Sequence, residues 1–145
     1  MKTLTEVLSD ATARAAFVTD GVALIKQEVA GKSGFSGMAL RTGFGAVQAI
    51  RPGILADALD MLLPSFSTAV EHHVDAARQE STITAYFTTH AARVADALLS
   101  VTDARAERAN NATLKRAYKG LRGQARTHTV AAIPGLGRLL QKHLG

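Results

Sequence analysis

The sequence predicts an all-α fold, a single-domain bundle of about six to eight helices joined by short turns. Alanine is abundant, runs of β-branched residues are absent and there are only 3 prolines, a composition that favours helices over strands. Apolar residues recur at helical spacing, and no alternation typical of a strand reaches a useful length. At 145 residues the chain has the size of one domain, and no linker or repeat divides residues 1–145.

The first third predicts three helices. Thr3 and Glu6 fit a capping box, which starts a short helix that runs to about Leu8. Ser9 or Asp10 caps a longer second helix that ends at Gly31. The apolar face of this second helix carries Val18, Val22, Ile25 and Val29. Ser36 is the predicted cap of a third helix, whose glycines 43 and 45 suggest that another helix packs closely against it.

Two prolines set the predicted boundaries in the middle of the chain. After the break at Arg51-Pro-Gly53, Ile54 to Leu63 is apolar almost all round and is predicted to be the central core element. Pro64 disfavours helix at the residue before it, so a separate fifth helix is predicted to follow. Ser81 or Thr82 then caps one long helix, with an apolar stripe of Ile83, Phe87, Ala91, Val94, Leu98 and Val101.

The last third is strongly basic. Residues 104–145 hold nine Lys or Arg and one acid, Glu107, whereas the preceding residues hold eight Lys or Arg and eleven acids. A helix is predicted from Asn110-Asn111 to Ile133-Pro-Gly135, followed by a short terminal helix with four leucines. The longer helix has a basic face of Lys115, Lys119, Arg122 and Arg126, and an apolar face of Leu114, Tyr118, Leu121, Ala125 and Ala132.

This basic segment allows three interpretations. As a nucleic-acid contact it neutralises phosphates through Arg108, Lys115, Lys119, Arg122 and Arg126, although Tyr118 is the only aromatic residue there. Peripheral membrane contact is not expected, because the terminal helix lacks Trp and Phe. In the third interpretation the basic segment docks against the acidic remainder of the chain, or is simply solvated.

Few residues suggest chemistry. The chain has no cysteine, no secretory signal and no apolar stretch long enough to cross a membrane, so we expect a cytoplasmic protein. Glu71, His72, His73 and Asp75, with His90 further along, are the one cluster of metal-ligand residue types, and a metal-dependent enzyme built on His73 and His90 is one hypothesis. His73 lies on an apolar stripe, which favours a core histidine, so no metal, cofactor or catalytic residue is predicted.

Five spaced segments carry a family resemblance. They are Val22-Ala-Leu-Ile-Lys-Gln-Glu-Val-Ala-Gly-Lys-Ser-Gly34, Arg51-Pro-Gly-Ile54, Leu62-Leu-Pro64, Ala95-Asp-Ala-Leu-Leu-Ser-Val-Thr-Asp-Ala-Arg105 and Ile133-Pro-Gly-Leu-Gly-Arg138. In these the chain resembles a family of small actinobacterial proteins known only as a domain of unknown function. The resemblance covers nearly the whole chain and implies an all-helical cytosolic protein. It assigns no functional residue.

The leading functional hypothesis is therefore a non-enzymatic helical protein that acts as an interaction module or binds a small apolar ligand. Glycine-lined helix faces and the Ile54 to Leu63 element are predicted to frame an internal apolar groove. Nucleic-acid binding through the basic helix is the first alternative, and the metal-dependent enzyme is the second. The many apolar helical faces also leave room for a homodimer, although no heptad seam specifies one.

Overall fold

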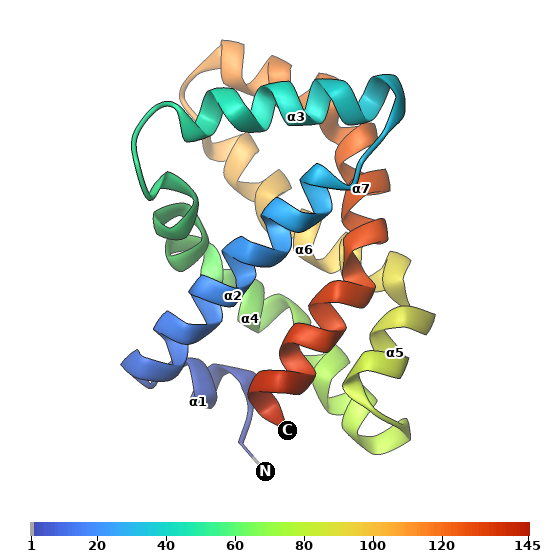
Figure 1. The fold of residues 1–145 in the computed structure, drawn as a ribbon. Coiled ribbons are helices and arrows are strands. Elements are labelled where there is room, and N and C mark those ends of the chain that lie inside the picture. Colours follow the sequence, from blue (N-terminus) through green and yellow to red (C-terminus); the bar gives the residue numbers. More distant parts are fainter. Residues whose placement is uncertain (1) are drawn as a thin grey trace.

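A computed structural model describes residues 2–145, apart from the side chains of Phe35, Ser36, Leu114 and Ala117. Over this part of the chain there are seven helices and no strand, which confirms the predicted all-α class (Figure 1). The helices are α1 (Leu4–Leu8), α2 (Ala11–Ala30), α3 (Gly34–Gln48), α4 (Ile54–Glu80), α5 (Ile83–Thr89), α6 (Ala91–Arg108) and α7 (Ala112–Leu144).

Local capping sets the first helix boundaries. The Thr3 hydroxyl accepts a hydrogen bond from the Glu6 amide at 3.0 Å, and Asp10, one of the two predicted caps of α2, accepts from the Ala13 amide at 2.8 Å. The predicted start of α3 after Ser36 is wrong, because the helix already begins at Gly34, whose φ of 75° turns the chain into it. The Ser36 side chain itself lies outside the described part of the chain.

Helix α4 runs through Pro64, so the predicted division into two helices at this residue is wrong. Proline lacks the N–H that would bond to the carbonyl four residues earlier, which belongs to Asp60. Arg14 of α2 takes over this role: its Nη2 donates to the Asp60 carbonyl at 2.5 Å, and its Nε donates to the Asp60 carboxylate at 2.6 Å. A guanidinium from a neighbouring helix thus satisfies the acceptor that proline leaves without a backbone donor.

This substitution of donors can be tested by a double-mutant cycle. Arg14→Met should lower the free energy of unfolding by about 1 kcal/mol, below the ~1.5–3 kcal/mol of a hydrogen bond to a charged group, because the site is exposed. In the Pro64→Ala background the restored N–H at position 64 bonds to the Asp60 carbonyl, so Arg14→Met should cost less there. Urea denaturation of the wild type, the two single variants and the double variant measures the cost of Arg14→Met in each background. Equal costs in the two backgrounds would show that Arg14 does not compensate for Pro64.

Helix α7 also continues through a proline, Pro134, so its predicted end at Ile133-Pro-Gly135 is wrong. Figure 1 shows the carboxyl half of α7 lying between α2 and α5, which it contacts. A Cβ atom at Gly135 would lie 2.7 Å from Cδ1 of Leu24, and one at Gly137 would lie 3.0 Å from Cβ of Phe87. The small residues after Pro134 are therefore contact points between helices, and this packing holds the helix together across the proline.

The long helix predicted after Ser81 or Thr82 is wrong in one respect, because it is divided at His90 into α5 and α6. Thr82 is the cap, with its hydroxyl accepting from the Ala85 amide at 3.1 Å. At His90 the backbone has φ −107° and ψ 31°, away from helical values. Phe87 of α5 and Val94 of α6 lie on either side of this change of direction, and each is fully buried.

The core lies along the second half of α4 and not at Ile54 to Leu63, as the sequence predicted. Within that stretch only Leu63 is buried, and Met61 is 60% exposed. Several fully or almost fully buried residues from α4 to α7 form the centre instead, namely Val74, Ala77, Phe87, Val94, Ile133 and Leu140. Side chains from Ile54 to Leu63 flank this centre, and two of them, Leu59 and Leu63, line a cavity.

Candidate ligand cavity

A cavity of about 320 Å³ lies among the helices, with walls supplied mainly by α2, α4 and α7. Its lining includes Phe17, Leu24, Leu63, Val70, Ile133 and Leu140. Protein interiors rarely contain voids larger than a water molecule, and an engineered apolar cavity of ~150 Å³ already binds benzene. At about twice that volume, the space falls at the lower end of the range of small-molecule pockets.

Close contact between α2 and α4 closes one part of the wall. Gly21 is buried and lines the cavity, and a Cβ atom there would lie 2.8 Å from Cδ2 of Leu59. The glycines that the sequence singled out do not have this role, because a Cβ atom at Gly43 or Gly45 would meet nothing within 4 Å. The predicted groove is thus present in part: Leu59 and Leu63 line it, and the glycine at its wall belongs to α2.

Polar groups are scarce along the cavity. The Ser67 hydroxyl, buried in the wall, donates to the Leu63 carbonyl at 2.7 Å and so has its partner within α4. Among the described lining residues the charged ones are Glu28, in the last turn of α2, and Lys32, in the turn that follows it; their Oε2 and Nζ atoms lie 3.7 Å apart. Their side chains are 26% and 17% exposed. The cavity therefore offers a long apolar wall with one charged spot at its edge.

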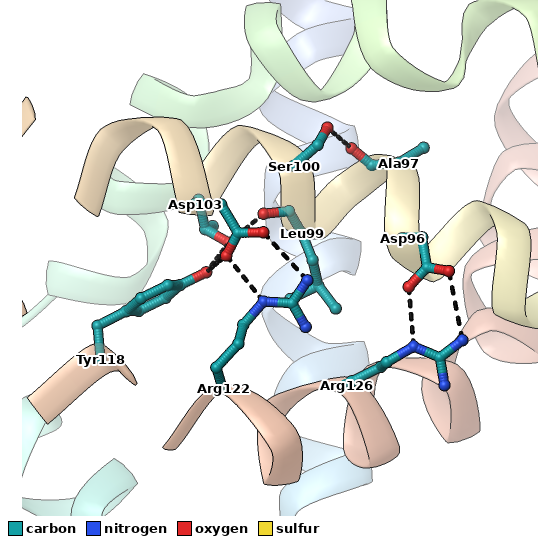
Figure 2. A network of polar contacts seen from close by, with 9 residues as sticks. Asp96, Ala97, Leu99, Ser100, Asp103, Tyr118, Arg122 and Arg126 are labelled. Atoms are coloured by element: carbon teal, nitrogen blue, oxygen red, sulfur yellow. Dashed lines mark hydrogen bonds and ion pairs between the residues drawn. The ribbon is translucent and has the colours of Figure 1, made fainter. Parts of the chain in front are cut away.

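The basic face of α7 is partly paired with α6, as Figure 2 shows. Arg122 donates from Nε and Nη2 to the two carboxylate oxygens of Asp103 at 2.8 and 3.0 Å, and Arg126 holds Asp96 in the same way at 2.9 and 3.3 Å. The Tyr118 hydroxyl also donates to Asp103, at 2.6 Å. Hydrogen bonds from Arg122 first and then Tyr118 hold the pKa of Asp103 below its ordinary value, and Arg126 does the same for the pKa of Asp96.

The remaining residues of the predicted nucleic-acid contact, Arg108, Lys115 and Lys119, are exposed. Lys115 and Lys119 line a wider and more polar hollow of about 710 Å³ between the end of α6 and the start of α7. Arg122 lines the same hollow, and both Arg122 and the exposed Arg126 are paired with carboxylates of α6. At the far end of α7, Lys142 and His143 contact Asp20 at 3.0 and 2.7 Å.

The rings of His73 and His90 both lie close to one aromatic ring, that of Tyr86. His73 is buried, with its Nδ1 3.5 Å from the Tyr86 hydroxyl, and the ring of His90 lies 4.3 Å from that of Tyr86 between centroids. Glu71 is turned toward α1, where it accepts hydrogen bonds from the Leu4 and Thr5 amides at 3.0 Å each. No group of three or more His, Asp or Glu side chains within the described residues is arranged to hold a metal ion.

His73 should make stability depend on pH. Burial, followed by the nearby His72, Arg93 and His90, lowers its pKa from the ordinary 6.5, so the unfolded chain binds the proton more readily. Its contribution to stability is full above the unfolded pKa and is lost as the pH falls through the window below it. In urea denaturation at pH 7.5 and 5.5, His73→Gln should therefore lose less stability on acidification than the wild type. An equal loss in His73→Gln and the wild type would contradict this role.

Comparison with known proteins supplies a family and no activity. Within residues 2–145, no helix combines the length and the apolar character needed to cross a bilayer. No curated protein and no solved structure matches the chain. A family model described as a family of unknown function (DUF6918) matches residues 4–144, almost the full length. The chain therefore belongs to this family of unknown function, as its spaced sequence motifs suggested.

Proposed function

We propose that this protein binds a small, chain-like apolar ligand in the cavity between α2, α4 and α7, and that it does so without catalysis. The observation that carries the proposal is the cavity itself, about 320 Å³ with an almost wholly apolar wall. Apolar wall that no side chain covers lacks van der Waals partners, so leaving this space unfilled forgoes packing contacts. A ligand that fills the space recovers packing contacts that the side chains do not make.

The volume sets the size of the ligand. Scaled from the ~150 Å³ cavity that accepts the six carbons of benzene, the space accommodates on the order of ten to twelve carbons. The wall is built from several helices and has hydrogen-bonding partners for its few polar atoms, so it offers little to a polar or charged ligand body. A single alkyl chain with one polar end matches this arrangement.

A series of straight-chain alcohols from hexanol to tetradecanol, measured by titration calorimetry, tests the proposal. Each added methylene that enters the cavity should tighten binding about fourfold, because burying a CH₂ group is worth about 0.8 kcal/mol. The gain should stop once the chain fills the cavity, near decanol or dodecanol. Absence of saturable binding would refute the proposal. A steady gain through tetradecanol would also refute it, since adsorption to an open surface has no such limit.

Several other predictions made from the sequence remain predictions. A cytoplasmic location, a homodimer and a nucleic-acid contact are not needed for this function. The predicted nucleic-acid contact consists of Arg108, Lys115, Lys119, Arg122 and Arg126. The ion pairs of Arg122 and Arg126 favour the interpretation that part of the basic charge stabilises the packing of α7 on α6. In the part of the chain that the structure describes, no group of side chains that could hold a metal ion includes His73 and His90, so we do not propose a metal-dependent reaction there.

A further inference from the structure

Charged side chains gather at one edge of the cavity, and they bear on the polar end of the ligand: Lys32 and Glu28 line the cavity, and Arg41 and Arg138 lie beside them. Lys32 lines the cavity, and the guanidinium of Arg41 donates to the Lys32 carbonyl. Arg138 approaches from α7: the point where a Cβ atom of Gly135 would stand is 3.5 Å from its Nη2 and 3.3 Å from Oε1 of Glu28. We call Lys32, Arg41 and Arg138 the cationic rim; Glu28 is the acid among them.

The rim is incompletely neutralised. The Lys32 Nζ to Glu28 Oε2 distance of 3.7 Å is well above the ~2.7–2.9 Å of a strong charge-assisted hydrogen bond. Within residues 2–145, neither Arg41 nor Arg138 forms an ion pair with a carboxylate. Because the Lys32 side chain is mostly buried, its charge is screened less by solvent than that of a fully exposed lysine. The site therefore favours an additional anion.

Resting on the proposed function, we infer that the ligand is a fatty acid, a single alkyl chain with a carboxylate head. The carboxylate lies at the rim between Lys32 and Arg138, and the chain extends along α2 toward Ile133 and Leu140. The carboxylate oxygens accept hydrogen bonds from the Lys32 ammonium and the Arg138 guanidinium, while the chain contacts only apolar wall. Three cations against one acid disfavour an alkylamine, and a neutral alcohol gains nothing from the excess charge.

Three ligands with the same chain and different heads provide the test: decanoate, decanol and decylamine, titrated into the protein by calorimetry at pH 7.5. In the wild type, decanoate should bind at least tenfold more tightly than decanol, and decylamine should bind more weakly than decanol. Lys32→Met should remove most of the preference for decanoate and leave decanol binding nearly unchanged, with Arg138→Met acting in the same direction. Lys26→Met, at an exposed position on α2 that does not line the cavity, is the matched control and should keep the wild-type preference.

The outcomes separate the head-group inference from the proposed function. Equal binding of decanoate and decanol by the wild type would overturn the fatty-acid inference while leaving an apolar ligand in place. A full preference for decanoate in both Lys32→Met and Arg138→Met would also overturn it, because the rim would then not be its source. Binding of none of the three ligands would overturn both. Decanol binding by each variant confirms that its cavity has folded.

Discussion

Phe87→Ala should lower the free energy of unfolding by about 3–5 kcal/mol, the cost of deleting a buried aromatic side chain. Phe87 has no exposed surface, and it lies where α5 meets α7, with its Cβ 3.0 Å from the Cβ position of Gly137. Because α7 continues through Pro134 only with the help of this packing, the cavity left by alanine removes contacts from both helices. Urea denaturation at pH 7.5, followed by circular dichroism, measures the loss.

The control for this substitution is Met61→Ala on α4. Met61 is 60% exposed, so its removal should change the free energy of unfolding by no more than about 0.5 kcal/mol. Similar effects of the two substitutions would contradict the placement of the core along α4 to α7, and would restore the predicted core at Ile54 to Leu63.

Ala132→Phe should weaken decanol binding by about a hundredfold or more while leaving the protein folded. Ala132 lines the cavity and is only partly buried, so a phenyl ring at this position has open space to enter. Filling apolar space without displacing neighbours commonly stabilises a protein, and the melting temperature should therefore stay constant or rise. Titration calorimetry with decanol measures the binding, and a thermal melt measures the stability.

The adjacent Ala131 supplies a matched control. It is exposed and does not line the cavity, so Ala131→Phe adds the same side chain to the same helix outside the cavity. This variant should bind decanol as the wild type does. Wild-type binding by Ala132→Phe would show that the ligand sits elsewhere on the protein.

Local signals in the sequence predicted the fold class and several helix boundaries. Thr3, Asp10 and Thr82 act as caps through contacts with amides three residues away, so short spacings suffice to recognise them. Pro64 and Pro134 led to wrong helix boundaries, because the contacts that keep each helix continuous come from residues distant in the sequence. The donor that replaces the missing N–H at Pro64 comes from Arg14, 46 residues earlier than the Asp60 carbonyl that it reaches.

The cavity was harder to predict than the helices. Periodicity shows which face of a helix is apolar, but it does not show whether two apolar faces fill the space between them. Leu59 and Leu63 were within the predicted groove, whereas no local pattern in the sequence placed Glu28 and Lys32 at its edge. The pairing of Arg122 and Arg126 had an available signal: Asp96 and Asp103 lie seven residues apart, and therefore on one face of the preceding helix.

Contact between the alkyl chain and the cavity wall is the central claim, and nuclear magnetic resonance of methyl-labelled protein with bound decanol tests it most directly. Ile133 and Leu140 line the cavity and are each 1% exposed, so cross-relaxation between their methyl groups and the alkyl chain requires a ligand inside the protein. We predict saturable contacts from the chain to both residues, and none to Leu121, which is 57% exposed on the outer part of α7. Contacts to Leu121 without any to Ile133 and Leu140 would place the ligand on the surface and contradict the proposed function.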